Sequence, residues 1–283
     1  MKRLLSIEFQ KIQKNRASKV LVITYFVLLS LITLIASLKF NIGSFEINIA
    51  EQGIFNFPYI WHFNTYIASW FKLFLAVVIV SMMANEYTYG TLKQNLIDGL
   101  SKKEFILSKF YVVIAFALAS TVFVFIMSLV LGYSFSSYTE FSIVFSDLDY
   151  LLAYFIKLVA FFSFCLFLGI LVKRSAFALG FLIAWSIFEQ IFYGFFKFNV
   201  LNGTHKKENF ADTIIQFFPL ESMGNLIKEP FSRLSAVKSI ETAIGGSQTH
   251  KIYSVHFSEI LIVSVWIAIF ILTSFYILRK RDL

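Results

Sequence analysis

The polar stretch NEYTYGTL, residues 85–92, lies between two long apolar runs of the chain. Gly90 is expected to break the helix before it, because glycine weakens a helix interior and readily adopts turn conformations. Thr91 and Gln94 have the spacing of a capping box, the side-chain pair that closes the start of a helix. The stretch therefore predicts that a separate helix begins at residue 91.

This helix, residues 91–98, is predicted to be short and mostly polar. Leu92 gives it an apolar edge, whereas Lys93 and Gln94 make the remainder polar. Gly99 is expected to end it, since glycine is common just past a helix end.

Ser101 and Glu104 repeat the capping-box spacing and predict that the next helix begins immediately afterwards. The pattern is thus helix, break, short helix, break, helix. Such an element favours a docking site for another protein; the alternative is an ordinary loop.

The composition is that of a membrane protein. The chain has 283 residues, of which 58% are hydrophobic and 15% charged, and its mean hydropathy is +0.74. A spanning helix needs about 20 mostly apolar residues, and the first apolar run lacks the small-residue cleavage site of a signal peptide. The runs that satisfy this length are approximately 20–38, 61–84, 105–133, 149–172, 176–196 and 256–278. The expected fold class is an all-α polytopic membrane protein with six transmembrane helices.

The distribution of Lys and Arg predicts that both termini are cytoplasmic. Basic residues concentrate before the first span, after the second and fourth spans, and in the C-terminal tail. Segment 197–255 also carries basic residues, yet it falls on the outer side, where a segment of this length only weakly determines orientation. The net charge of +8 is therefore attributed to topology, and no nucleic acid partner is expected.

Residues 2–18 predict an amphipathic helix lying on the inner leaflet of the lipid bilayer. Leu5, Phe9 and Ile12 fall on one face of this helix. Glu8 interrupts that apolar stripe. Two interpretations remain open: Glu8 reaches water or Lys11, or it contacts a partner protein.

Lys72, Lys157 and Glu189 lie within apolar runs, where charged residues are costly and usually face a bundle interior. At about 1.5 Å rise per residue, each lies roughly 21–24 Å above the inner boundary. We expect Glu189 to pair with Lys72 or Lys157 at this shared depth. The alternative is that the lysines extend independently toward the interface.

The sequence contains none of the motifs of an ATPase or a hydrolase. It has no G-x-x-x-x-G-K-[ST], no H-E-x-x-H and no G-x-S-x-G. The four His and the single Cys form no ligand spacing for a metal. We therefore expect no catalytic residue, no metal and no cofactor bound by this chain.

The chain resembles the ABC-2 type transporter permeases, and most closely the small bacterial permeases of the bacitracin- and lantibiotic-resistance kind. Six spans, the N-terminal helix and the long outer segment share that architecture. In the family, Gly-Thr-Leu is followed by a Pro-x-Ser-Arg turn; here Gly99 replaces the Pro and Lys102 the Arg. The residues that carry the resemblance are Glu86, Gly90, Thr91 and Leu92, followed by Gly99, Ser101, Lys102 and Lys109.

The resemblance implies one ABC-2 type permease membrane domain over residues 1–283. Residues 1–19 would be the interfacial connecting helix, 85–104 the cytoplasmic coupling segment, and 197–255 the extracytoplasmic segment that closes the path. Coupling and ATPase docking would involve Glu86, Gly90, Thr91, Leu92, Lys93, Gln94, Gly99, Ser101, Lys102 and Lys109. The connecting helix would use Leu5, Glu8, Phe9 and Ile12.

The resemblance also implies partners. The chain would pair with a second permease, identical or homologous, in a bacterial cytoplasmic (inner) membrane. P-loop ATPase subunits, which hold ATP and Mg, would dock on the 91–98 coupling helix and drive export of an amphipathic, peptide or lipid-like substrate. Glu86 is expected to form a salt bridge with Lys102 or Lys109 and hold the joint rigid.

Two other functions remain open at this point. A membrane anchor or regulatory subunit would use the 91–98 helix to dock a soluble partner. A secondary transporter would favour an inverted repeat and broken spans with polar residues at the midplane, neither of which is evident in the sequence.

Overall fold

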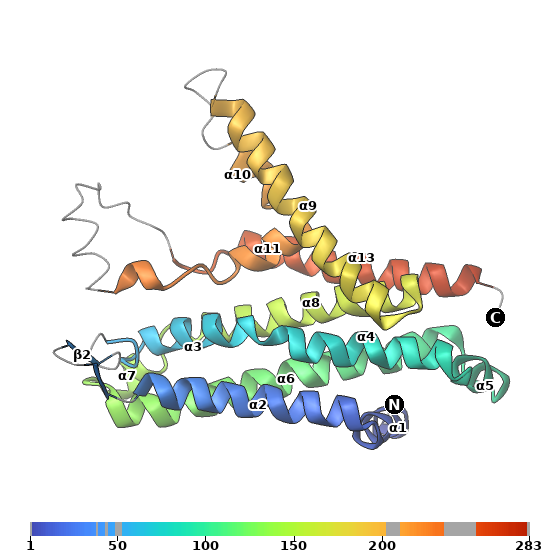
Figure 1. Ribbon diagram of the computed structural model, residues 1–283, viewed down its shortest axis with the longest axis horizontal. Helices are drawn as coiled ribbons and strands as arrows, with labels where there is room; N and C mark the ends of the chain where they lie inside the picture. The colour runs from blue at the N-terminus through green and yellow to red at the C-terminus, as the bar shows by residue number, and fades with distance from the viewer. Residues whose placement is uncertain are drawn as a thin grey trace.

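The structure, a computed structural model, describes residues 2–37, 39–42, 45–48, 53–201, 210–234 and 253–281. It is a bundle of long apolar helices, which confirms the all-α polytopic class (Figure 1). Among the described residues, five helices are each long and apolar enough to cross a membrane, and there are six such spans if a bent pair of helices is taken as one. The helices that make these crossings are α2 (Arg16–Ser37), the pair α3 (Tyr59–Trp70) and α4 (Lys72–Thr88), α6 (Lys102–Phe135), α8 (Asp149–Val172), α9 (Ser175–Leu201) and α13 (Phe257–Lys280).

The second crossing is broken, which the sequence analysis did not expect. Helices α3 and α4 meet at Phe71 with a bend of 45°. The Thr65 hydroxyl donates to the Trp61 carbonyl at 2.6 Å, and the Ser69 hydroxyl donates to the Tyr66 carbonyl at 2.7 Å. Side-chain hydroxyls that bond to preceding carbonyls bend helices. The break thus lies close to two such hydroxyls and contains neither Pro nor Gly.

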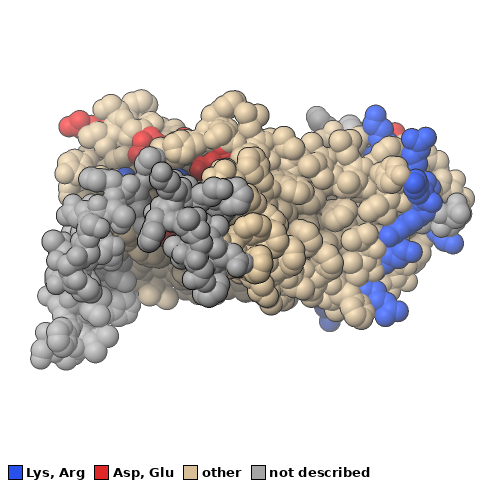
Figure 2. Space-filling view, turned by 90° about the horizontal axis from the view of Figure 1, so that it is seen from above, with Lys and Arg blue, Asp and Glu red and all other residues tan. Residues whose placement is uncertain are grey.

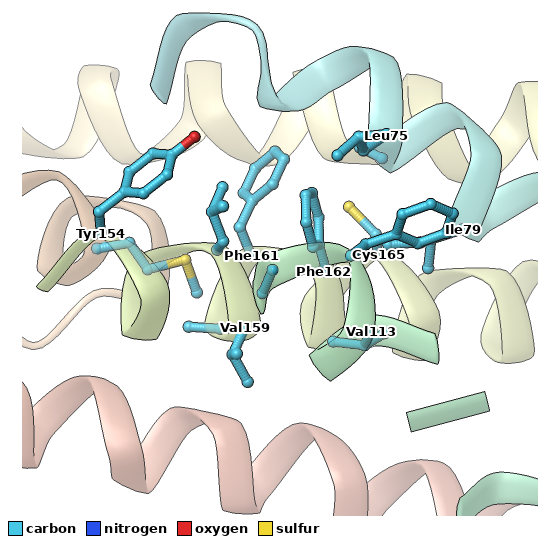
Figure 3. Close-up of a cluster of buried hydrophobic side chains, with 14 of the residues drawn as sticks. Leu75, Ile79, Val113, Tyr154, Val159, Phe161, Phe162 and Cys165 are labelled. Carbon is cyan, nitrogen blue, oxygen red and sulfur yellow. The ribbon is translucent and has the colours of Figure 1, made fainter. Parts of the chain in front are cut away.

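Helix α8 occupies the centre of the bundle and packs against α4, α6, α9 and α13. Figure 3 shows Phe162 and Cys165 of α8 among Leu75 and Ile79 of α4, and all four are buried. Most of the other helices keep an exposed apolar face, as expected where the solvent is lipid. Helix α8 is thus the element against which the others are positioned.

A small β-hairpin was not predicted. Strands β1 (Lys39–Ile42) and β2 (Phe45–Asn48) pair antiparallel, with Ile42 opposite Phe45. The sequence does carry the signal, because apolar residues alternate on both sides of Gly43 and Ser44. The hairpin and the short helix α7 (Phe141–Val144) lie at one end of the bundle (Figure 1).

The opposite end carries the N-terminal helix α1 (Lys2–Lys14), the short helix α5 (Thr91–Ile97) and the last turn of α13 (Figure 1). Lys and Arg side chains gather in a band at this end, while uncharged surface extends over the middle of the visible face (Figure 2). We call it the basic end. The positive-inside rule predicts that this end faces the cytoplasm.

The outer segment between α9 and α13 contains α10 (Phe210–Ile215), α11 (Pro219–Asn225) and a 3₁₀ turn, η2 (Phe231–Arg233). Residues 202–209 and 235–252 of the predicted segment 197–255 lie outside the described residues. Helix α11 packs against α8, α9 and α13. Helix α11 therefore covers part of the bundle, whereas α10 lies beside the part of α9 that projects away from it (Figure 1).

Candidate functional site

Helix α5 is a separate element because Gly90 terminates α4 and precedes α5. Gly90 has φ 67° and stands at the N-cap of α5, in the left-handed region that glycine tolerates best. The predicted Thr91–Gln94 capping box is wrong. Thr91 is the first helical residue, and its hydroxyl donates instead to Oε2 of Glu86 at 2.5 Å. The backbone of Gly90 makes the turn, and the hydrogen bond from Thr91 to Glu86 connects α5 to α4.

The end of α5 and the start of α6 are as predicted. Gly99 has φ 96°, and its N–H donates to the Leu96 carbonyl while that of Leu100 donates to the Asn95 carbonyl. These two bonds are the Schellman motif. The capping box at Ser101 is also present: its hydroxyl accepts from the Glu104 N–H at 3.2 Å, and its N–H donates to Glu104 Oε2 at 3.0 Å.

Four charged side chains and Thr91 form a group that we call the elbow cluster: Glu8, Lys11, Glu86, Thr91 and Lys109. Glu8, Glu86 and Lys109 are buried, whereas Lys11 and Thr91 are partly exposed. The Lys109 ammonium is fully buried and donates to Glu8 Oε2 at 2.6 Å and to Glu86 Oε1 at 2.5 Å. Lys11 donates to the same Glu86 oxygen at 2.8 Å and lies 3.6 Å from Glu8 Oε1. The cluster joins α1, α4, α5 and α6 at one point.

The predicted salt bridge between Glu86 and Lys109 is therefore present, but the alternative with Lys102 is wrong. Lys102 donates to the carbonyls of Arg279 at 3.3 Å and Arg281 at 3.0 Å, because the end of α13 lies beside the start of α6. Glu8 is 4% exposed and faces inward. Of its two interpretations, the structure supports the contact with Lys11 and adds Lys109, which the sequence analysis missed.

The two carboxylates and two ammonium groups of the cluster balance in charge. Burial alone would lower the pKa of Lys11, but its hydrogen bond to Glu86 and the charges of Glu8 and Glu86 outweigh it, so the pKa is raised. Lys11 therefore stays charged at neutral pH. Removing one member of a buried ion pair leaves an uncompensated charge, which costs about 3–5 kcal/mol.

The apolar stripe of α1 packs against the bundle. Ile12 is buried, the Phe9 ring lies edge-on to Phe116 of α6 at 6.1 Å, and Leu5 packs against the core. Figure 1 shows α1 end-on while α2 runs along the bundle, so α1 crosses the bundle axis, the orientation expected of a helix at the membrane surface.

Arg281 forms a second connection at the basic end. Its Nη1 donates to the Ile170 carbonyl and to the Tyr87 hydroxyl at 3.1 Å, and its Nη2 donates to the Leu171 carbonyl at 2.9 Å. The guanidinium thus satisfies carbonyls in the last turn of α8, where a cation is favoured. From the sequence, the basic residues of the C-terminal tail, Arg281 among them, predicted only the membrane orientation. The position of Arg281 just past a predicted helix is the feature that could have indicated this contact.

One face of α5 remains uncovered. Leu92 is buried against the bundle, whereas Lys93 and Gln94 are exposed. Ile97 is 83% exposed and Tyr89 is 74% exposed. Two large apolar side chains therefore project from a polar surface, the pattern of a protein interaction site.

The three intramembrane charges, Lys72, Lys157 and Glu189, line one cavity of about 1010 Å³. The predicted pairing of Glu189 with a lysine is nevertheless wrong. Its carboxylate accepts from the N–H groups of Leu220 at 3.1 Å and Glu221 at 2.9 Å, and from Trp185 Nε1 at 2.6 Å. Glu189 thus caps the N-terminus of α11, where the free N–H groups attract a carboxylate.

Comparison with known proteins agrees with this architecture. The model of the family described as ABC-2 family transporter protein matches residues 3–283. No curated protein matches the chain. Proteins of this family are multi-pass membrane transport components that are not themselves catalytic and generally work with ATPase subunits. The chain therefore belongs to the ABC-2 transporter family, as the transmembrane permease of an ABC transporter.

Proposed function

We propose that this permease is an exporter driven by separate P-loop ATPase subunits that dock on α5. The proposal depends on how α5 is held. Turns at Gly90 and Gly99 define its two ends, Leu92 packs against the bundle, and the opposite face is exposed. A short helix held in this way moves as a rigid body with the spans beside it. ATP and Mg would be held by the partner, not by this chain.

The exposed face of α5 fits a cleft on the partner. Ile97 and Tyr89 would serve as apolar anchors, and Lys93 and Gln94 would form the polar rim. Binding energy at interfaces concentrates in a few such side chains. This face is the proposed ATPase contact.

The elbow cluster supplies a route from α5 to the membrane helices. Thr91 connects α5 to Glu86 at the end of α4, Glu86 connects to Lys109 of α6, and Lys109 connects to Glu8 of α1. A displacement of α5 by the ATPase would therefore move α1, α4 and α6 together. Coupling through a contiguous set of packed polar contacts is a recognised physical route.

The remaining assignments complete the proposal. The chain would act as one permease domain, beside a second permease that is identical or homologous, in a bacterial cytoplasmic membrane. The outer segment would close the translocation path above the bundle. The substrate would be amphipathic, with peptide and lipid-like molecules as candidate classes, because aromatic and aliphatic side chains dominate the membrane-embedded surface.

Co-purification from native membranes in mild detergent, with mass spectrometry of what accompanies the permease, tests this function. We expect a stoichiometric P-loop ATPase with the unaltered chain, and its loss with Ile97→Asp. The matched control is Phe141→Asp, which alters another strongly exposed apolar residue, 75% exposed against 83% for Ile97, at the opposite end of the bundle.

A preparation of the unaltered permease that contains no ATPase would overturn the proposal. So would equal retention of the ATPase by the Ile97→Asp variant, because the docking face would then lie elsewhere. In the first case, a membrane anchor or a secondary transporter would become the better description.

A further inference from the structure

The cavity that holds the intramembrane charges lies in the outer half of the bundle. It is bounded by α3, α4, α8, α9 and α11 and measures about 1010 Å³. The break at Phe71 places Lys72 at the start of α4, directly beside this space. No part of the coupling route described above uses this cavity.

Two lysines line the cavity from neighbouring helices. Lys157 of α8 is 4% exposed and reaches none of the described carboxylates within ion-pair distance. The Lys72 ammonium lies 4.4 Å from the centre of the Phe161 ring, one helical turn after Lys157 on α8, and likewise pairs with no described carboxylate. Both ammonium groups line the same cavity, and no described carboxylate lies within ion-pair distance of either one. Burying a cation without a direct ion-pair partner is costly, so this pair of lysines favours an anion between them.

Three carboxylates also line the cavity, and each has other interactions. Glu189 accepts from the N-terminus of α11, as described above, and Glu229 accepts from the hydroxyl of Ser232 at 2.7 Å. Lys228, a third cation in the lining, lies 3.5 Å from Glu259. Glu221 has interactions of its own and also acts on Lys157 electrostatically. The ammonium groups of Lys72 and Lys157 remain the cations that face the cavity without a direct carboxylate partner among the described residues.

The cavity also has an apolar rim. Trp70 and Leu73 on one side, and Ile183 and Ile187 on the other, line it and are each more than half exposed. These side chains belong to spanning helices, so they face the hydrocarbon of the bilayer. Two lysines without a direct carboxylate partner, next to an apolar rim, match a molecule with an anionic group and a hydrocarbon chain.

We propose that this cavity binds an anionic amphiphile, with its phosphate or carboxylate between Lys72 and Lys157 and its hydrocarbon chain along the apolar rim. This inference rests on the proposed function, because it restricts the proposed amphipathic substrates to those that carry an anionic group. Binding itself requires neither ATP nor a partner ATPase, so the two proposals fail separately.

The test is native mass spectrometry of the full-length permease in a neutral detergent, titrated with phosphatidylglycerol or with phosphatidylcholine of the same acyl chains. We expect tighter binding of phosphatidylglycerol, weakened by about tenfold or more in the Lys72→Met/Lys157→Met variant, the loss expected when a charge-assisted contact is removed. The control Lys19→Met/Lys103→Met removes the same charge from exposed positions at the basic end. It should leave the preference unchanged.

Lys157→Gln alone keeps a polar group in place and serves as the second variant if the double variant does not fold. Equal binding of the two lipids, or a preference that survives loss of the cavity lysines, overturns the proposal. Inorganic phosphate is the third probe, read as a shift in melting temperature. If phosphate alone stabilises the permease as much as phosphatidylglycerol does, through the same lysines, the site takes a water-soluble anion and the amphiphile is excluded.

Discussion

The Nζ atom of Lys109 lies 2.5 Å from Oε1 of Glu86, inside the protein and with neither side chain more than 3% exposed. This pair joins the third crossing to the end of the second, at the position where α5 departs. Glu8 and Lys11 complete it from α1. The joint between the short helix and the bundle is therefore an electrostatic contact in which every charge has an opposite partner.

Replacing Lys109 with Met should strongly destabilise the permease. Glu8 and Glu86 would remain buried with only Lys11 to compensate them, at a cost of about 3–5 kcal/mol. Thermal unfolding in detergent measures this effect as a lower melting temperature. Lys103→Met, an exposed change six residues earlier, is the control and should have little effect. Adding Glu8→Gln to Lys109→Met should recover part of the loss, and an absence of any recovery would argue against the cluster as described.

Replacing Thr91 with Val should uncouple the permease from its ATPase while leaving membrane insertion intact. The substitution preserves shape but removes the hydroxyl that donates to Glu86. We expect lower stimulation of ATPase activity in reconstituted vesicles at unchanged permease content. Thr88→Val is the matched control, because the Thr88 hydroxyl bonds to the Ala84 carbonyl of its own helix. Equal loss in both variants would remove Thr91 from the coupling route.

Replacing Gly99 with Ala should destabilise the turn after α5. At φ 96° a side chain is strained even though no atom lies within 4 Å of the added Cβ. A left-handed conformation costs a non-glycine residue about 1–2 kcal/mol. Gly180→Ala also meets open space, but it lies within helix α9, where alanine is favoured. Melting temperatures should therefore fall for the first variant and not for the second, and a matching change in both would contradict the conformational argument.

Replacing Glu189 with Gln should loosen α11 from α9. The neutral side chain keeps the acceptor oxygen but loses the charge that favours the helix N-terminus, at a cost of about 0.5–2 kcal/mol. Hydrogen exchange of the Leu220 and Glu221 amides should accelerate, since these amides donate to Glu189. Gln190→Ala, at the exposed neighbouring position, should leave their exchange unchanged. Unchanged exchange in Glu189→Gln would mean that α11 is held by its apolar contacts alone.

Hydropathy and glycine position were sufficient to predict most of the architecture. The six apolar runs correspond to the crossings, and Gly90, Gly99 and Ser101 mark real helix ends. These features depend on residues close together in the sequence. The break at Phe71 could not be predicted in the same way, because no Pro or Gly marks it in the sequence.

The charged contacts also differ in whether the sequence could predict them, and the difference depends on how far apart the partners are in the chain. Glu86 and Lys109 are 23 residues apart and flank one short segment, so their pairing could be predicted from the sequence. Glu8 and Lys109 are 101 residues apart, and the sequence does not show which span meets α1. Glu189 was misassigned because its partners are backbone N–H groups, which every segment possesses and no side-chain pattern reveals.

The elbow cluster has a consequence for how the chain is made. Glu8, Lys11 and Glu86 are synthesised before Lys109, so the cluster is one positive charge short until the third span leaves the ribosome. The ion pairs that connect the N-terminal helix to the end of the second span are therefore complete only after the third span has been synthesised.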